Sequence, residues 1–381
     1  MKLNKIWTLI VVIIFLSNPN SYSQDKLRIM FYNTENLFDC KDNPSKNDED
    51  FLYNAPRKWN FFKYRQKLIN LSKVIVAAGE GDIPALVGLC EVENDSVLCD
   101  LMRLTHLRFL NYRYVITDSP DNRGINVALL YKRNLFKPID AKEHEILLGD
   151  RYKPTRNILH VTGVLPTNDT LDVFVCHFPS RSGGEIETRM ARKTAHLKLL
   201  EVINNVNNYR TKPLVIVMGD FNDYPTSNNL SYLQTPPDDL LDVDLVDNQY
   251  VNNMKDIVDN FKNVVDNYNN DVNKMYSLLL KNKVNIGLYN LMLPIVQWNR
   301  GTYKYNGEWG FLDQFFSNSI LLSKRIYPFV TNVKEINEPF LLTKDLKHLG
   351  VRPLRSYYGY KYENGYSDHL PIVCDIYLYP D

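Results

Sequence analysis

The stretch VMGDFNDYP, residues 217–225, joins the end of an apolar run to a short polar cluster. Residues 214–218, LVIVM, form the apolar run, whose composition is typical of a buried strand. Gly219 follows, and then come Asp220 and Asn222 with Phe221 between them. We interpret Gly219 as the residue at which the backbone turns after the strand, so that Asp220 and Asn222 face one site while Phe221 packs on the other side.

Short apolar runs of the same kind recur along the chain, and each ends in polar residues. They are LRIMFYN, ALVGLCEVEN, YRYVITD, INVALLYKR, ILHVTGVL, LDVFVCHF, LVIVMGDFN, FLDQFFSNS and LPIVCDIYLY. Two stretches between them, residues 64–79 and 185–206, have apolar residues at helical spacing. Because strands and helices alternate while several strand pairs lack a helix between them, we expect an α/β fold with mixed sheets.

The composition indicates a globular protein with no general affinity for polyanions. The chain has 381 residues, of which 44% are hydrophobic, enough for a large core. Its 45 basic and 44 acidic side chains give a formal net charge of +1. A near-neutral chain has no charge excess with which to coat nucleic acid or an anionic membrane, so any such specificity must be local.

The first residues have the order of a secretory signal peptide. Two lysines precede the apolar run 6–16, and a polar segment with small residues follows up to Ser23. The run is shorter than the roughly 20 apolar residues that span a bilayer, so we expect no stable membrane anchor. We therefore predict that residues 1–23 are removed and that the protein is exported, to the periplasm or the medium.

The cysteines do not suggest a disulfide framework. There are five of them, Cys40, Cys90, Cys99, Cys176 and Cys374, and an odd number leaves at least one unpaired within the chain. Three lie inside apolar runs, where a free cysteine behaves as a small hydrophobic residue. We expect a fold that does not depend on disulfides.

Residues from about 238 to 307 interrupt the alternation of strands and helices. This segment is rich in Asn and Asp, with Val and Leu at helical spacing. We interpret it as a helical insertion on the rim of one domain that spans residues 24–381. The alternative is a flap that selects the substrate, since long insertions near active sites often have that role.

Side chains suited to catalysis stand at the ends of the predicted strands. They are Asn33, Glu35, Glu91, His177, Asp220, Asn222, Asp313, Asp368 and His369. In open α/β sheets, residues beyond the strand ends line the site. A single Asp at such a place usually caps a turn and a single His usually packs, but their recurrence at five or six strand ends indicates one shared site.

The types of these residues favour hydrolysis with the help of a metal. The sequence contains neither a G-x-S-x-G elbow nor a Walker loop. Carboxylates such as Glu35 and Glu91 suit Mg²⁺ or Mn²⁺. Histidines can donate to phosphoryl oxygens, and an Asp beside an Asn can accept a proton from an oriented water. Together they predict metal-assisted hydrolysis of a phosphate ester.

Six motifs, taken in order, resemble those of the endonuclease/exonuclease/phosphatase superfamily. They are MFYNTENLFD, LVGLCEVEN, VFVCHFPSRSGG, VIVMGDFND, FLDQFFSNS and YSDHLPIV. The resemblance extends from Leu27 to the C-terminus, apart from the insertion. It implies a four-layer α/β sandwich in which two mixed β-sheets pack face to face with helices on the outside. It also implies a divalent-metal-dependent phosphoesterase.

The same resemblance implies a set of metal ligands. Glu91 would be the principal ligand, with Asn33 and Glu35 beside it and Asp368 close to the metal. The expected ion is Mg²⁺, with Mn²⁺ as the alternative.

The resemblance also implies the catalytic roles. Asp220 would activate or position the attacking water, and Asn222 would hold that water or the scissile phosphate. His369, oriented by Asp313, would stabilise charge on the phosphoryl oxygens. His177 would lie near the phosphate or the leaving oxygen.

Some assignments stay open. Glu93 competes with Glu91, because strand alternation would put both on the same side. The carboxylate that orients His177 is not evident, with Asp118 and Asp121 as candidates. Arg123 and Arg181 either bind substrate phosphate or are surface arginines in turns.

The leading prediction for function is an endonuclease or exonuclease on DNA or RNA that cleaves by in-line attack of an activated water. The alternative is a phosphatase or phospholipase C-type enzyme on inositol phosphates, sugar phosphates or sphingolipids. A catalytically silent binding module is a third hypothesis, against which the complete set of site residues weighs. We expect a monomer whose partner is nucleic acid or another phosphoester substrate, without a protein partner.

Overall fold

The computed structural model describes residues 26–227, 230, 288–296, 300–322 and 328–379. Its main elements are two six-stranded sheets. In spatial order the first sheet consists of β13 (Phe329–Glu335), β18 (Ile372–Tyr377), β1 (Lys26–Leu37), β2 (Leu86–Val92), β4 (Asn126–Lys132) and β3 (Tyr112–Ile116). The second consists of β5 (Lys137–His144), β6 (Ile158–Val164), β7 (Thr170–His177), β8 (Leu214–Asp220), β12 (Asp313–Asn318) and β9 (Leu288–Asn290).

Both sheets are mixed and have the same central arrangement. A parallel pair lies near the middle of each, β1 with β2 in the first sheet and β7 with β8 in the second. The other neighbours are antiparallel. The carboxyl ends of two parallel strands lie at the same edge of a sheet. The polar residues at the ends of β1 and β2 are therefore neighbours, and so are those at the ends of β7 and β8.

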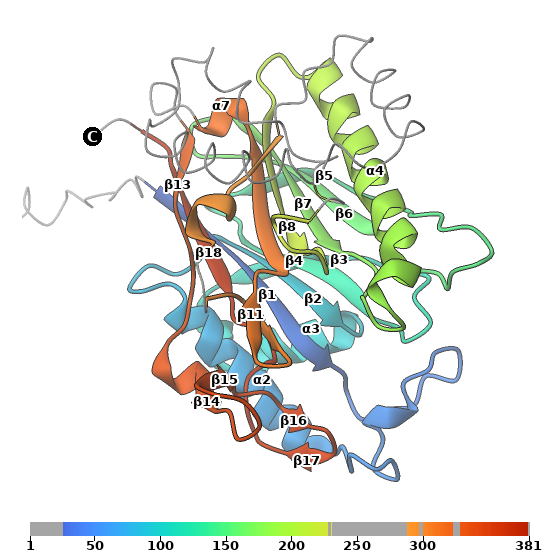
Figure 1. Cartoon of the computed structure of the whole chain (residues 1–381). Helices are drawn as coiled ribbons and strands as arrows, with labels where there is room; N and C mark the ends of the chain where they lie inside the picture. Colours follow the sequence, from blue (N-terminus) through green and yellow to red (C-terminus); the bar gives the residue numbers. More distant parts are fainter. Residues whose placement is uncertain (1–25, 228–229, 231–287, 297–299, 323–327, 380–381) are drawn as a thin grey trace, which may run out of the picture.

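Helices cover the outer faces of the two sheets (Figure 1). They are α2 (Phe61–Ala77) and α3 (Asp95–Arg103) on the first sheet and α4 (Glu185–Tyr209) on the second, besides the short α7 (Ser319–Leu322). One buried apolar cluster lies between the sheets, a second between the first sheet and α2 and α3, and a third between the second sheet and α4. The protein is therefore the α/β sandwich of four layers that the resemblance implied.

Shorter elements complete the fold at its rim. Three small hairpins pair β10 (Tyr303–Tyr305) with β11 (Glu308–Gly310), β14 (Leu342–Lys344) with β15 (Val351–Pro353), and β16 (Tyr357–Tyr358) with β17 (Lys361–Tyr362). The 3-10 turns are η1 (Glu49–Phe51), η2 (His106–Phe109), η5 (Leu293–Ile295) and η6 (Pro339–Leu341).

All nine predicted strands and both predicted helices are present, but the sequence pattern missed other elements. Strand β5 is an edge strand whose side chains are mostly exposed, so it lacks the apolar alternation by which strands are recognised. Most of the predicted insertion, residues 238–287, lies outside the described residues. Residues 288–290 already belong to the fold, since they form β9, which pairs with β12 in the second sheet.

All five cysteines are free, as the sequence predicted. In the described part of the chain, no helix has both the length and the apolar character needed to cross a membrane.

Candidate active site

The strand ends of the two sheets meet at a cavity of about 630 Å³. Eight of the predicted site residues line it: Glu91, Arg123, His177, Arg181, Asp220, Asn222, Asp368 and His369. Asn33 and Asp313 lie behind this wall, where Asn33 Nδ2 donates to Asp220 Oδ2 at 3.1 Å. The structure thus brings into one place residues that lie more than 300 positions apart in the sequence.

Gly219 has a different role from the one predicted. It lies within β8, which continues to Asp220, and its φ is not positive, so the chain does not turn there. A Cβ at this position would lie 2.5 Å from the carbonyl oxygen of Cys176 on β7. Only glycine therefore permits the close approach of β7 and β8. The turn comes at Asn222, whose φ is 51°.

Phe221 packs away from the cavity, as predicted, and is fully buried. On the opposite side, the Asp220 Oδ1 accepts a hydrogen bond from the backbone N–H of Asn222 at 2.9 Å. The Asn222 amide donates to the carbonyl oxygen of Phe178 at 3.0 Å, which fixes the orientation of its side chain.

Glu91 and the segment after Asn33 are both placed by strand irregularities. The pairing of β1 with β2 shifts between Asn33 and Leu37, and that of β2 with β4 shifts around Glu91. Glu35 and Glu91 have positive φ values of 50° and 58°. Left-handed backbone is uncommon for such residues and is concentrated at functional sites. These bulges redirect two acidic side chains that regular strands would place elsewhere.

His369 and Asp313 form a hydrogen-bonded pair. The His369 Nδ1 lies 2.7 Å from Asp313 Oδ2, and both side chains are buried. Burial disfavours the charged imidazole, but the charge and hydrogen bond of Asp313 outweigh it and raise the pKa of His369 to about 10. This histidine therefore carries a proton at neutral pH.

The second histidine, His177, lies near the carboxylates of Asp220 and Glu91. Its Nε2 lies 3.8 Å from Asp220 Oδ2 and 3.9 Å from Glu91 Oε1. Burial, with the positive charges of Arg156 and Arg123, holds the pKa of His177 well below its ordinary value. This histidine is therefore neutral.

Asp220 lies between the two histidines. Its Oδ2 is 3.9 Å from the Nε2 of His369 and 3.8 Å from that of His177. Burial raises the pKa of the Asp220 carboxyl to about 7, against the lowering effect of His369 and with the added charge of Asp313. A carboxyl group with a pKa near neutrality is suited to accept a proton in that pH range.

Glu35 does not line this cavity, and it is bonded to an arginine that the sequence did not single out. Arg355 donates from Nε to Glu35 at 3.1 Å and from Nη2 to Asp368 at 2.8 Å. The second oxygen of Glu35 accepts from the backbone N–H of Ser356 at 2.6 Å, and the buried Lys67 lies 3.8 Å away. Both oxygens of Glu35 are thus occupied by protein donors.

The two predicted substrate arginines both reach the cavity. Arg123 is half-exposed, with Nε 3.8 Å from Asp121. Arg181 pairs with Glu185 and lies over the ring of Tyr224, 4.8 Å from its centre. Each retains exposed surface toward the cavity.

The donor set of the cavity fits a divalent cation. Glu91, Asp220 and Asp368 all line the cavity and form what we call its carboxylate wall, in which Asp368 is also paired with Arg355 at 2.8 Å. Carboxylate oxygens are the ligands that Mg²⁺ and Mn²⁺ prefer. Two groups have ligand atoms within 4.8 Å of one another, namely Cys90, His177 and Asp220, and Asp220, Asp313 and His369. We favour the carboxylate wall, because Asp313 and His369 already bond each other and a thiol suits softer metals.

The alternatives left open by the sequence lie elsewhere. Glu93 accepts a hydrogen bond from the backbone N–H of Asp39 at 2.6 Å and lines a separate cavity, so the strand-alternation argument for it is wrong. The positive φ of Glu91 breaks the alternation on which that argument depended. Asp121 bonds Arg156 at 3.2 Å. Asp118 contributes its backbone N–H to Glu143.

Neither Asp118 nor Asp121 is thus the partner of His177. The Nδ1 of His177 is buried and has no hydrogen-bond partner within the described part of the chain. The neighbour that matters is Arg156, which donates to the carbonyl oxygen of Phe178 at 2.5 Å. Like Arg355 and Lys67, it is an isolated basic residue without a motif, so the sequence carried no signal for it.

The sequence model of the Endonuclease/Exonuclease/phosphatase family matches residues 28–284 and 236–378. The chain belongs to this family. Its members are metal-dependent phosphodiesterases and phosphatases, and the protein is accordingly a phosphoric ester hydrolase of the nuclease and phosphatase type. No protein among the curated sequences matches the chain.

Solved structures share the fold. A humanized TDP2 from D. rerio carrying 14 mutations has 14% sequence identity and a TM-score of 0.51, covering 92% of this chain and 99% of that one. A family protein from Bacteroides thetaiotaomicron has 11% identity, a TM-score of 0.51 and coverages of 93% and 99%. One from Bacteroides vulgatus has 13% identity, the same TM-score and the same coverages. At such identities the likeness establishes the fold.

Proposed function

We propose that the protein is an exported, Mg²⁺-dependent nuclease that hydrolyses phosphodiester bonds of DNA or RNA, with Mn²⁺ as an alternative ion. The observation that carries this proposal is the composition of the 630 Å³ cavity. Acidic and histidine side chains at its base are accompanied by two arginines and by three tyrosines, Tyr224, Tyr303 and Tyr305. The cavity therefore combines hydrolytic groups with groups that hold a polymer.

The aromatic rings favour a nucleic-acid strand as the substrate. Bases stack on aromatic side chains without regard to sequence, and arginines pair with the phosphates between them. The Tyr305 side chain is 61% exposed, and Tyr303 packs on His369 with ring centres 4.8 Å apart. An inorganic or sugar phosphate would leave the exposed ring unused.

We assign the general base to Asp220 and the stabilising hydrogen bonds to the two histidines. Asp220 accepts the proton of the attacking water, and Asn222 directs that water or the phosphate. The protonated His369 donates to the phosphoryl oxygens, whose negative charge increases in the transition state. The neutral His177 donates a hydrogen bond from its Nε2–H toward the leaving oxygen and keeps its proton.

We assign the metal to the carboxylate wall, with Glu91 as principal ligand and Asp368 close by. Asn33 and Glu35 complete the set that the sequence predicted, and Glu35 would have to leave Arg355 to bind. When bound, Mg²⁺ would neutralise charge on a phosphoryl oxygen.

The substrate is tested with a panel of purified candidates. Single-stranded and duplex DNA, RNA, bis-p-nitrophenyl phosphate, inositol phosphates and sphingomyelin are each incubated with Mg²⁺, Mn²⁺ or EDTA. We expect cleavage of DNA or RNA with Mg²⁺ and none with EDTA, and none by a His369→Ala variant purified in parallel, which controls for contaminating nucleases. Turnover of inositol phosphates or sphingomyelin without nucleic-acid cleavage would refute the proposal.

Export is a separate part of the proposal. It is supported by the apolar run 6–16 and the small residues before Gln24, which lie outside the described residues. N-terminal sequencing of the mature protein from its native host should find a start near Gln24 or Asp25. An intact Met1 would contradict export by this route. We further propose a monomer without a protein partner or membrane anchor, which light scattering of the mature protein tests.

A further inference from the structure

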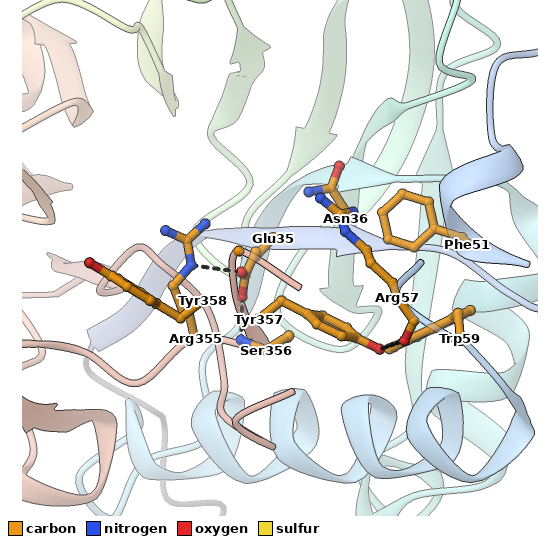
Figure 2. A pocket seen from close by; sticks show the side chains of 10 residues that line it. Glu35, Asn36, Phe51, Arg57, Trp59, Arg355, Ser356, Tyr357 and Tyr358 are labelled. Carbon is orange, nitrogen blue, oxygen red and sulfur yellow. Dashed lines mark hydrogen bonds and ion pairs between the residues drawn. The ribbon is translucent and has the colours of Figure 1, made fainter. Parts of the chain in front are cut away.

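A second cavity, of about 230 Å³, lies beside the active-site cavity. Four aromatic residues line it, Phe51, Trp59, Tyr357 and Tyr358, and two arginines face it, Arg57 and Arg355. Figure 2 shows the two guanidinium groups on opposite sides of the cavity, with Glu35 between them and Tyr357 near the floor. Among these residues only Glu35 was predicted from the sequence to belong to the site, as a metal ligand.

Arg355 links the two cavities. Arg355 lines the second cavity and reaches Asp368, which lines the first, at 2.8 Å. A polymer with its scissile phosphate in the first cavity therefore has its adjacent unit near the second. The smaller volume suits one unit of such a polymer.

Arg57 is held in place by aromatic rings and lacks a strong anionic partner. Its guanidinium lies 5.1 Å from the ring centre of Phe51 and 5.8 Å from that of Tyr357. Its Nε is buried, and none of the described residues accepts a hydrogen bond from it. The paired carboxylate is Asp50, at 3.9 Å and with a side chain that is 64% exposed, which makes this a weak ion pair.

The arginine is also positioned from behind. The Tyr357 hydroxyl donates to the backbone carbonyl of Arg57 at 2.9 Å, and the Trp59 indole N–H donates to the carbonyl of Asp39 at 2.9 Å. These bonds fix the loop that carries Arg57 against the rings. A positioned guanidinium that lines the cavity, with 26% of its side chain exposed, can bind an anion there.

The acidic residue of the cavity, Glu35, does not prevent an anion from binding there. Glu35 is already bonded to Arg355 and to the backbone N–H of Ser356, and Lys67 lies 3.8 Å from it. Its charge is therefore balanced within the protein. An incoming phosphate meets Arg57 without strong repulsion from this carboxylate.

We propose that the second cavity binds the nucleotide adjacent to the scissile phosphate, with a flanking phosphate on Arg57 and the base against Tyr358, whose ring is half-exposed. The inference rests on the proposed nuclease function and deepens it by naming a subsite. Rings that accept a base and a cation that accepts its phosphate are the two elements of single-strand recognition.

The test compares two substrates in an Arg57→Gln variant. A short single-stranded oligodeoxynucleotide carries flanking phosphates, whereas bis-p-nitrophenyl phosphate has one phosphate and cannot place phosphate in both cavities. We expect KM for the oligonucleotide to rise about tenfold, as for the loss of one charge-assisted contact, with kcat/KM for the small diester unchanged. The matched control is Arg108→Gln, which removes an exposed arginine that lies 4.5 Å from the ring centre of Phe109.

A salt titration separates phosphate binding from a structural role. Loss of one phosphate contact should reduce the slope of log Kd against log salt by about 0.7 for a single strand, measured by fluorescence anisotropy of a labelled oligonucleotide in EDTA. A merely structural change leaves this slope as it is. Should Arg57→Gln lower the melting temperature, Tyr358→Ala tests the same cavity at a half-exposed position and should also raise KM for the oligonucleotide alone.

Three results would overturn the inference. The first is an equal effect of Arg57→Gln on both substrates, and the second is an effect no larger than that of Arg108→Gln. The third is a wild-type protein that cleaves the small diester but no oligonucleotide, which would refute the nuclease proposal together with this subsite. The first two leave the nuclease proposal intact.

Discussion

The two histidines of the active site differ in charge although both face the same carboxylate. Their Nε2 atoms lie 3.9 and 3.8 Å from Asp220 Oδ2, and both rings are buried. His369 has Asp313 on its far side and a pKa raised to about 10, whereas His177 has Arg156 nearby and a pKa well below its ordinary value. Burial, reinforced by Arg156, therefore keeps His177 neutral, whereas the charge and hydrogen bond of Asp313 overcome burial and keep His369 protonated.

The difference also gives the two rings opposite effects on stability with pH. The pair of His369 and Asp313 stabilises the fold fully below the unfolded pKa of about 6.5, and this contribution is lost as pH rises toward the folded pKa of about 10. The neutral His177 favours the fold above pH of about 6.5, and its contribution is lost as pH falls toward its depressed pKa.

Of the tests of this difference between the histidines, removal of the charged one has the largest expected effect. His369→Ala should lower kcat by roughly 10² or more with little change in KM, because a contact made mainly in the transition state is lost. Steady-state kinetics on the substrate identified by the panel would measure this. An unchanged kcat would exclude His369 from the mechanism.

Replacing the carboxylate behind that histidine should have a smaller effect with a distinct pH signature. Asp313→Asn removes the charge that raises the pKa of His369, so kcat should fall between about tenfold and a hundredfold. The alkaline limb of the pH–rate profile should move to lower pH, because His369 then loses its proton sooner. The double mutant should be little worse than His369→Ala alone, since the two residues act as one unit. Independent, multiplicative losses would show that Asp313 acts by another route.

Glu91 tests the side of the site that contains the neutral histidine. Its Oε1 lies 3.9 Å from His177 Nε2, and it lines the cavity, whereas Glu93 does not. Glu91→Gln should weaken Mg²⁺ binding at least about tenfold by calorimetry and reduce activity at low Mg²⁺. Glu93→Gln is the matched control and should leave Mg²⁺ affinity near that of the wild type. The reverse pattern would move the ligand to Glu93.

The smallest expected effect is on the pKa of the neutral histidine, His177. Arg123 is half-exposed and its charge lowers the pKa of His177, after burial and Arg156. Arg123→Gln should raise that pKa by less than about 1 unit, since solvent screens an exposed charge. NMR titration of the imidazole in metal-free protein would measure the change. A shift in the opposite direction would show that the positive charges do not hold His177 neutral.

The sequence predicted nine of the twelve strands in the two main sheets and eight of the residues that line the active-site cavity. Buried strands such as residues 214–220 are continuous apolar runs, and such runs are visible without any knowledge of their neighbours. The edge strand β5 was missed because its exposed side chains carry no such pattern. Gly219 was recognised as special but for the wrong reason, since its close neighbour, Cys176, lies on another strand.

By itself, the sequence determined the family and the fold class, because local apolar patterns and short motifs encode them, and it named eight residues that line the active-site cavity. The tertiary structure alone decided the charge of each histidine, since Asp313 and Arg156 are distant in sequence from the rings they influence. It likewise separated Glu91 from Glu93, through a bulge that alternation does not predict. Burial and electrostatic pairing depend on which segments of the chain meet in space, and no single stretch of the sequence contains that information.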